Sequence, residues 1–122
     1  MVSKMNYEKY AIKKGKQDLL SSLKGLNKKI IKEYLEEYCL DNIEELKDDI
    51  IDKFEFCLSV SKDDIFSQAY FKKLLEYENS MIMAAYNADI EALWVFIYEN
   101  NGHYSYYIPT EIKKIIKNEL NL

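Results

Sequence analysis

The sequence predicts a mainly α fold: a bundle-like domain of four to five helices with a C-terminal β-hairpin and a closing helix. Apolar residues recur with the period of an amphipathic helix over most of residues 28–77. Nearer the C-terminus, two runs of β-branched and aromatic residues flank an Asn-Gly turn, which is a hairpin signal. The chain of 122 residues has the length of one domain, so we expect a single domain over residues 1–122.

The N-terminal part of the chain predicts two helices. Residues 5–23 have a helical pattern that Gly15 weakens in the middle and that Gly25 ends. Asn27 is a good N-cap for a second helix over 28–39, because its side chain can accept a hydrogen bond from the first turn. The apolar residues of this second helix fall on one side, which predicts packing against the rest of the domain.

Two further helices are predicted from capping signals. Asp41 opens a D-x-x-E sequence, close to the capping-box pattern, at the start of a helix over 42–58. Ser61 and Asp64 repeat this signal for a fourth helix over 62–77. In both segments the apolar residues form one stripe, as in a helix with one face buried.

The segment after the fourth helix is ambiguous. Residues 81–86 suit either a strand or a helix. Asn87 or Asp89 could cap a short helix that runs to Leu93.

A change of period marks the predicted hairpin. Residues 95–98 and 103–108 are rich in β-prone side chains, and an Asn-Asn-Gly turn joins them. Pro109 ends the second strand, because proline cannot donate to a sheet ladder. Thr110 is the predicted cap of the closing helix over 110–122.

The C-terminal part of the chain resembles the end of a winged-helix domain. The resemblance rests on residues 92–98, the Asn-Gly turn, residues 106–109 and the helix after them. The same stretch is similar to the C-terminal parts of small helical proteins of low-GC bacteria and phages. A winged helix implies a regulator that places a basic recognition helix on DNA just before the wing. Residues 84–91 occupy that position here and contain no lysine, which departs from the winged-helix pattern.

Charge is sorted along the chain. The basic N-terminal helix 1–32 holds nine lysines against two acidic residues, and the acidic helical body 33–99 holds seventeen acidic residues against five lysines. The closing helix 110–122 is nearly balanced, and the net charge of the whole chain is −4. The chain contains no arginine. We call residues 1–32 the basic head and residues 33–99 the acidic body. These two segments favour binding partners of opposite charge, and they also allow two copies to pair as a homodimer.

The acidic residues of the predicted third helix are the first candidate for a partner-binding site. Carboxylates repeated along a helix can imitate a run of phosphates, to which nucleic-acid-binding proteins respond strongly. The candidate residues are Glu45, Asp48, Asp49, Asp52 and Glu55. A solvated helix face and a weak calcium or magnesium site are the alternative interpretations of the same residues.

This acidic row suggests a class of function. Small anti-restriction and anti-CRISPR inhibitors are similar to this chain in being short, acidic and helical. That resemblance implies a non-enzymatic protein from a phage or mobile element, which occludes a host nucleic-acid-targeting complex. Its partner would be a protein with a basic surface, such as a nucleic-acid-binding enzyme.

The predicted hairpin offers a second partner-binding surface. Strand alternation would place one set of its aromatic side chains inward and the other outward. We therefore expect Tyr104 and Tyr106 to contribute to an aromatic patch, and such patches are enriched at protein interfaces. Ordinary packing of the hairpin is the alternative.

The basic head supports an alternative function, a nonspecific nucleic-acid-binding or transcriptional regulator. Lysines neutralise phosphates without choosing a sequence, and nearby tyrosines can stack on exposed bases. The candidate residues are Lys9, Lys13, Lys14 and Lys16. Pairing of this segment with an acidic surface is the other interpretation.

The sequence gives little support for catalysis. Motifs for a nucleophilic serine, a phosphate-binding loop or a zinc centre are missing, and His103 is the one histidine. A small hydrolase that uses His103 with Ser105 is the weakest of the candidate functions. We therefore expect no enzyme activity, no cofactor and no metal.

Two features bear on environment. Cys39 and Cys57 fall at apolar positions of helical patterns, so we expect two buried thiols, with a disulfide between neighbouring helices as the alternative. No apolar run approaches the roughly 20 residues of a membrane span, and the N-terminus lacks the apolar core of a signal peptide. We therefore expect a cytoplasmic protein that does not bind membranes.

Overall fold

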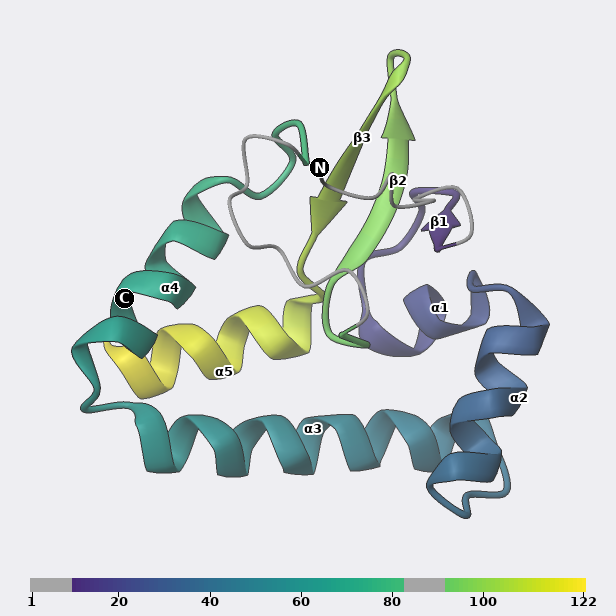
Figure 1. Ribbon diagram of the computed structural model, residues 1–122, viewed down its shortest axis with the longest axis horizontal. Coiled ribbons are helices and arrows are strands. Elements are labelled where there is room, and N and C mark those ends of the chain that lie inside the picture. Colours follow the sequence, from purple (N-terminus) through teal and green to yellow (C-terminus); the bar gives the residue numbers. More distant parts are fainter. Residues whose placement is uncertain (1–9, 83–91) are drawn as a thin grey trace, which may run out of the picture.

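The computed structural model describes residues 10–82 and 92–122, and it confirms the mainly α fold with a hairpin and a closing helix (Figure 1). In chain order, the elements are β1 (Ala11–Ile12), α1 (Leu19–Lys24), α2 (Lys28–Glu37), α3 (Ile43–Ser61), α4 (Ile65–Glu76), β2 (Phe96–Asn100), β3 (His103–Tyr107) and α5 (Thr110–Leu120). The strands form one sheet in the order β1-β2-β3.

The helices surround the base of this small sheet. The long helix α3 runs along one side of the molecule, and α5 lies alongside it, between α3 and the sheet (Figure 1). The N-terminal helix α1 packs against both α3 and α5. Helices α1 and α2 lie near the start of α3, and α4 lies near its end (Figure 1). Within the described residues, no helix is long and apolar enough to cross a membrane.

The N-terminal segment differs from the predicted helix over 5–23. Ala11 and Ile12 form β1, which pairs in parallel with Ile97 and Tyr98 of β2. The pairing buries Ile12 and satisfies backbone groups at one edge of the hairpin, and this long-range gain outweighs local helix propensity. Helix α1 begins only at Leu19. The basic N-terminal helix predicted over 1–32 is therefore wrong for the described residues 10–32, which form a strand, a short helix and the start of α2.

Helices α2, α3 and α4 confirm the predicted pattern, with shifted starts for the last two. Asn27 caps α2 as predicted, and its Oδ1 accepts a hydrogen bond from the Lys29 N–H at 2.8 Å. Asn42, one residue after the predicted Asp41, caps α3 by accepting from the Glu45 N–H at 2.9 Å. Asp64 alone caps α4. An amide or carboxylate oxygen directly before the first turn thus fixes each start.

The hairpin forms at the predicted place. Asn101 and Gly102 both have positive φ angles, of 50° and 85°, which suits the tight turn that Asn-Gly favours. Pro109, rather than Thr110, is the N-cap of α5, and it makes no side-chain capping bond. Glu111 in the first turn of α5 accepts instead from the Leu19 N–H at 3.0 Å, so it joins the starts of α5 and α1.

Both faces of the hairpin are covered. Tyr106 and Tyr107 are adjacent on β3 and are both fully buried. The Tyr106 hydroxyl donates to the Leu74 carbonyl of α4, whereas the Tyr107 hydroxyl hydrogen bonds with Ser22 of α1. Neighbouring side chains of a strand point to opposite faces, so α4 and α1 lie against opposite faces of the sheet.

The predictions for the ambiguous segment fall mostly outside the described residues, which omit 83–91. At its start, Met81 forms an isolated antiparallel bridge with Ser105. Residues 92–94, where a short helix was predicted to end, form bends and turns before β2.

Candidate functional site

The predicted acidic residues lie on one side of α3, and we call them the acidic face: Glu45, Asp48, Asp49, Asp52 and Glu55. The opposite side of α3 holds the buried stripe of Leu46, Ile50, Phe54 and Leu58. At about 3.6 residues per turn, the two sets project in opposite directions. Asp49 is half-buried and the other four acidic residues are exposed. The acidic row is therefore accessible to solvent, as a partner-binding surface requires.

Two lysines of α3 neutralise part of the acidic face. Lys53 lies 2.7 Å from Asp49, and Lys47 lies 3.5 Å from Asp48. Asp52 and Glu55 form no ion pair with any described residue. Helix α3 holds six carboxylates and two lysines, so its outer side remains strongly negative.

A groove opens along one edge of the acidic face, between α2, α3 and the turn before β2. It has a volume of about 300 Å³. Its aromatic residues are Tyr34, Tyr38, Phe54, Phe71 and Trp94, and Asp49, Lys53 and Cys57 also line it. We call it the aromatic groove.

Ring contacts organise the aromatic groove. Phe54 lies 5.0 Å from Trp94 and 5.8 Å from Phe71, measured between ring centroids. Tyr34 and Tyr38 stack at 6.1 Å, one turn apart on α2. The groove therefore has a packed cluster of rings on the α3 and α4 side and a pair of tyrosines on the α2 side.

Lys53 is the charged group at the rim of the aromatic groove. Its Nζ lies 3.9 Å from the centre of the Tyr38 ring as well as beside Asp49. Lys53 donates a hydrogen bond to Asp49, which raises the pKa of Lys53 above its ordinary value, and the negative charges of Asp49 and Glu37 add to this effect. The groove thus already holds one cation between an aromatic face and a carboxylate.

The predicted aromatic patch on the hairpin is wrong for Tyr106. This residue is fully buried under α4 and cannot reach a partner. Burial raises the pKa of its hydroxyl far above the ordinary value, in agreement with a site closed to water. Tyr104 is half-buried and remains at the surface.

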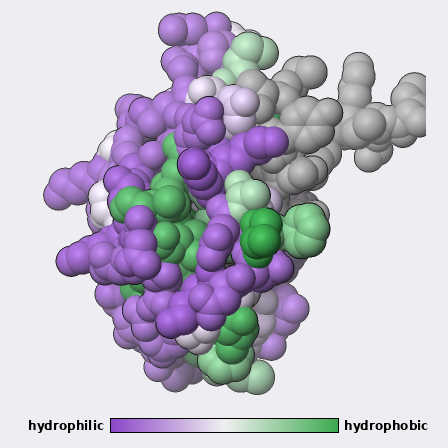
Figure 2. Space-filling view, turned by 90° about the vertical axis from the view of Figure 1, so that its left-hand side faces the viewer, coloured by the Kyte–Doolittle hydropathy of each residue, from purple (hydrophilic) through white to green (hydrophobic). Residues whose placement is uncertain are grey.

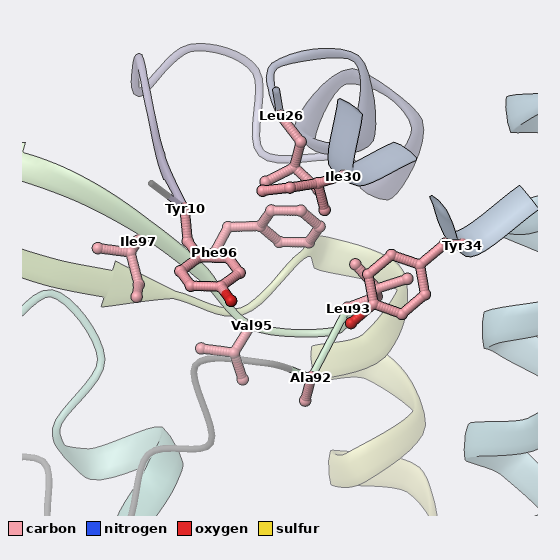
Figure 3. Close-up of a pocket in the computed structure, with 9 residues that line it drawn as sticks. All are labelled: Tyr10, Leu26, Ile30, Tyr34, Ala92, Leu93, Val95, Phe96 and Ile97. Carbon is pink, nitrogen blue, oxygen red and sulfur yellow. The ribbon is translucent and has the colours of Figure 1, made fainter. Parts of the chain in front are cut away.

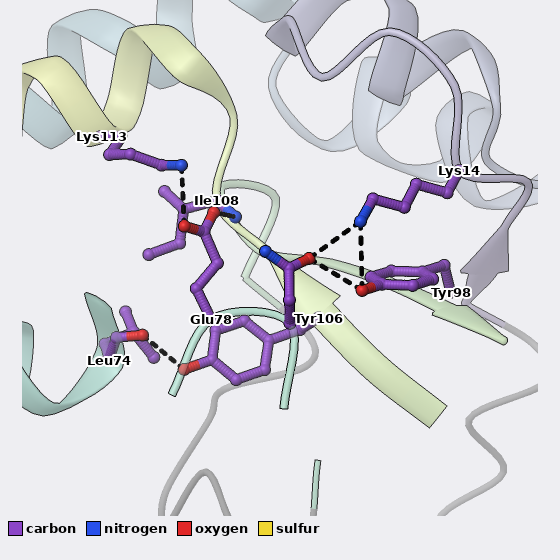
Figure 4. A network of polar contacts seen from close by, with 8 residues as sticks. Lys14, Leu74, Glu78, Tyr98, Tyr106, Ile108 and Lys113 are labelled. Carbon is purple, nitrogen blue, oxygen red and sulfur yellow. Dashed lines mark hydrogen bonds and ion pairs between the residues drawn. The ribbon is translucent and has the colours of Figure 1, made fainter. Parts of the chain in front are cut away.

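The fold brings Tyr104 to the basic head. Tyr104, Lys13 and Lys14 line one open hollow of about 680 Å³ between β1 and the hairpin turn, together with Glu99. The Nζ of Lys14 donates to Asn79 Oδ1 at 3.1 Å and to the Tyr98 hydroxyl at 3.3 Å (Figure 4), and neither of these partners lines the hollow. Lys16 is exposed, and Lys9 lies outside the described residues. The sequence did not indicate that these lysines would meet Tyr104.

Two other hollows in the described part of the chain have few polar or charged side chains. One lies between α2 and β2, where side chains that include Leu26, Ile30 and Phe96 point toward one another (Figure 3). Its accessible volume of about 10 Å³ is no larger than one water molecule needs. The other lies between α4 and the end of α5, near the exposed Ile65 and Leu122. Figure 2 faces this end of the molecule and shows hydrophobic residues among hydrophilic ones.

The cysteines and the histidine complete the reactive groups. Cys39 and Cys57 are both exposed free thiols, so the prediction of two buried thiols is wrong. Cys39 follows the end of α2 with a positive φ of 56°, and Cys57 lies at the edge of the buried stripe of α3. Within residues 10–82 and 92–122, no cluster of His, Cys, Asp or Glu could hold a metal ion. Ser105, which the sequence paired with His103, is fully buried and so is closed to a substrate.

No protein-family model, curated protein or solved structure matches this chain. The candidate sites therefore rest on their own geometry and charge.

Proposed function

We propose that this chain is a non-enzymatic binding protein that docks on a basic surface of a partner protein through the acidic face of α3. The observation that carries the proposal is the exposure of the carboxylates opposite the buried stripe. Helix α3 packs through the buried stripe, with Ile43 and Ile51 partly buried beside it, so the opposite row is not needed for the core. Concentrated negative charge also attracts a basic partner over roughly 10 Å at moderate salt.

The spacing of the carboxylates supports imitation of nucleic acid. The eleven residues from Glu45 to Glu55 span a rise of about 15 Å along the helix. Five carboxylates over this distance give one carboxylate for about every 4 Å of axis, close to the roughly 3.4 Å per phosphate of one DNA strand. Lys47 and Lys53 pair with two of these carboxylates, and the other three form no ion pair among the described residues. A channel that binds phosphates through lysine and arginine would therefore meet acidic groups at nearly the spacing of phosphates on a DNA strand.

The concrete form of the proposal is an inhibitor from a phage or mobile element, of the anti-CRISPR or anti-restriction kind. It would occupy the basic channel of a host nucleic-acid-targeting complex by steric and electrostatic occlusion. In this form, the protein and the nucleic acid compete for one surface. Added nucleic acid should then displace the protein from its partner, and added salt should weaken the complex.

Charge reversal tests the role of the acidic face. The variant Asp48→Lys, Asp52→Lys, Glu55→Lys changes three exposed residues and leaves the aromatic groove intact. The matched control Glu33→Lys, Asp63→Lys, Glu76→Lys makes the same charge change at exposed positions off this face. We expect binding of a labelled octalysine peptide, followed by fluorescence anisotropy, to fall far more in the first variant. Equal losses in both variants would contradict the proposal.

The hollow of Lys13, Lys14 and Tyr104 favours one alternative, nonspecific nucleic-acid binding by the basic head. It places two lysines beside a tyrosine on one surface, which suits a phosphate backbone with a stacked base. The same hollow contains Glu99, which opposes phosphate binding. The second candidate function is therefore a winged-helix-like regulator that binds nucleic acid through the basic head.

Point substitutions are the suitable test of the alternative. Deletion of residues 1–16 would remove β1 and damage the fold, because Ala11 and Ile12 belong to the sheet. The variant Lys13→Gln, Lys16→Gln removes two exposed charges and spares the sheet pairing. If the alternative holds, this variant binds labelled duplex and single-stranded DNA more weakly and with a smaller salt dependence than the parent protein.

A homodimer also remains a proposal. Exposed lysines of the basic head in one copy could pair with the acidic face of another. Such a dimer should dissociate as salt rises, because contacts between exposed charges are screened. Light scattering at low and high salt would detect the change of mass.

A further inference from the structure

We propose that the aromatic groove binds an arginine side chain of the partner protein, stacked on Tyr38 and paired with Asp49. This inference rests on the proposed function, because it names the anchor that a basic partner would insert beside the acidic face. The groove and the face share Asp49 and adjoin along α3. A partner held by the acidic face would therefore place its neighbouring side chains at the groove.

Lys53 shows what chemistry the groove accepts. Its ammonium lies 3.9 Å from the centre of the Tyr38 ring and 2.7 Å from an Asp49 carboxylate oxygen. The protein thus fills this position with its own cation. The Lys53 side chain is 57% exposed and extends from the rim of the groove, so it can move into solvent when another cation arrives.

Arginine fits this position better than lysine does. A guanidinium is planar, so it can stack on the Tyr38 face, and it can form two parallel hydrogen bonds with one carboxylate. An ammonium contacts the ring and the carboxylate as a point charge, without planar stacking and without two parallel hydrogen bonds. The Asp49 side chain is only 28% exposed, which protects such a pair from screening. The chain itself contains no arginine, so the anchor must come from another protein.

The rest of the groove suits the apolar part of the anchor. Phe54, Phe71 and Trp94 form a cluster of rings that can cover the methylene groups of an arginine and an adjacent apolar side chain. Trp94 is the single tryptophan of the chain and lines the groove. Its fluorescence therefore reports directly on occupancy of the groove.

The test compares two peptides of equal charge, octa-arginine and octalysine, on the full chain. Binding is measured by anisotropy of the labelled peptide, and groove occupancy is measured by Trp94 emission. We expect octa-arginine to bind about fivefold more tightly and to change Trp94 emission, because stacking and bidentate pairing add to charge attraction. Octalysine should bind through charge alone and change the emission less.

Two pairs of variants localise the effect. Lys53→Met removes the resident cation, so it should raise affinity for octa-arginine several-fold more than Lys47→Met, which removes the same charge from α3 outside the groove. Tyr38→Leu should abolish the preference for octa-arginine. Phe66→Leu, at an exposed aromatic residue that does not line the groove, should preserve it. Circular dichroism of each variant confirms that the fold is intact.

The outcomes separate this inference from the function beneath it. If both peptides bind equally well and Trp94 emission stays constant, the groove is not the anchor site, while the acidic face can still bind a basic partner. If neither peptide binds, both proposals fail. A preference for octa-arginine that survives Tyr38→Leu also overturns the groove as its source.

Discussion

Glu78 pairs with Lys113 at 2.7 Å and thereby ties the segment after α4 to α5. The second oxygen of the same carboxylate accepts a hydrogen bond from the Ile108 N–H at 2.8 Å, at the end of β3 (Figure 4). The Glu78 side chain is 11% exposed, so both interactions are largely shielded from water. One carboxylate thus joins three segments that position the sheet above α5.

Two substitutions at Glu78 should separate its charge from its acceptor role. Glu78→Gln keeps an acceptor for Ile108 and should lower the free energy of unfolding by about 1 kcal/mol. Glu78→Ala leaves the Ile108 N–H without its partner and should cost about 2–3 kcal/mol. Urea denaturation measures both values. The control Glu76→Ala, at an exposed position on α4, should stay within about 0.5 kcal/mol of the parent protein.

Tyr106→Phe tests the burial of the hairpin under α4. The change removes the hydroxyl that donates to the Leu74 carbonyl, and leaves that carbonyl without this donor. We expect a loss of about 1 kcal/mol in the free energy of unfolding, with unchanged binding of any partner. The control is Tyr38→Phe, at a residue that is 41% exposed, and it should change the free energy of unfolding little. A loss of partner binding without a loss of stability would show that Tyr106 belongs to a binding surface after all.

Asp18 predicts a defined pH dependence of stability. Its carboxylate caps α1 by accepting from the Ser21 N–H at 3.0 Å, and chiefly this bond lowers the pKa of Asp18 below its ordinary value of 3.8. The stabilisation is therefore present above the ordinary pKa and is lost as pH falls through the lower pKa of the folded state. Asp18→Asn keeps a capping oxygen but removes the charge.

The corresponding measurement is denaturant unfolding of Asp18→Asn and the parent protein between about pH 7 and about pH 2. The parent should be the more stable protein at neutral pH. The difference should shrink on acidification and vanish once the Asp18 carboxylate is protonated in the folded state. A difference that stays constant across this range would mean that the charge of Asp18 contributes nothing.

The exposed thiols of Cys39 and Cys57 should be reactive in the folded protein, whereas the sequence predicted two buried thiols. Both should react with a thiol reagent such as dithionitrobenzoate in the folded protein, without denaturant, because both are accessible free thiols. Absorbance would follow the release of the coloured product. Reaction only after denaturation would indicate that the thiols are buried.

Local signals accounted for most of the helical fold. Asn27 was predicted correctly as a cap, because an N-cap contacts only the next few residues, whereas α4 is capped by Asp64 and not by Ser61. The Asn-Gly turn likewise fixed the hairpin, since its positive φ angles are a property of two adjacent residues. Such features depend on short stretches of chain, which is why one sequence suffices to predict them.

Long-range contacts produced the errors. Ile12 became part of a strand because β2 lies beside it, more than eighty residues later in the chain. Tyr106 was buried because α4 covers its face of the sheet, which no alternation pattern of the hairpin itself reveals. Propensity and periodicity describe one element at a time and do not specify which element covers it.

The candidate site divides in the same way. The acidic face follows from the spacing of carboxylates on one helix, so the sequence placed all five of its residues. The aromatic groove needs α2, α3 and the turn at Trp94 to converge. The four-residue spacings of Tyr34 with Tyr38 and of Asp49 with Lys53 were visible in the sequence. The sequence did not show that these two pairs, one on α2 and one on α3, line the same groove.

The most direct test of the central claim is the binding of labelled octalysine to three proteins: the parent, the acidic-face variant Asp48→Lys, Asp52→Lys, Glu55→Lys, and the matched control Glu33→Lys, Asp63→Lys, Glu76→Lys. Anisotropy at about 50 mM and about 200 mM salt supplies affinity and its salt dependence. We predict that the acidic-face variant loses at least about tenfold more affinity than the control, because local charge density and not net charge sets the binding. Equal affinity in the two variants would contradict a partner-binding role for the acidic face of α3.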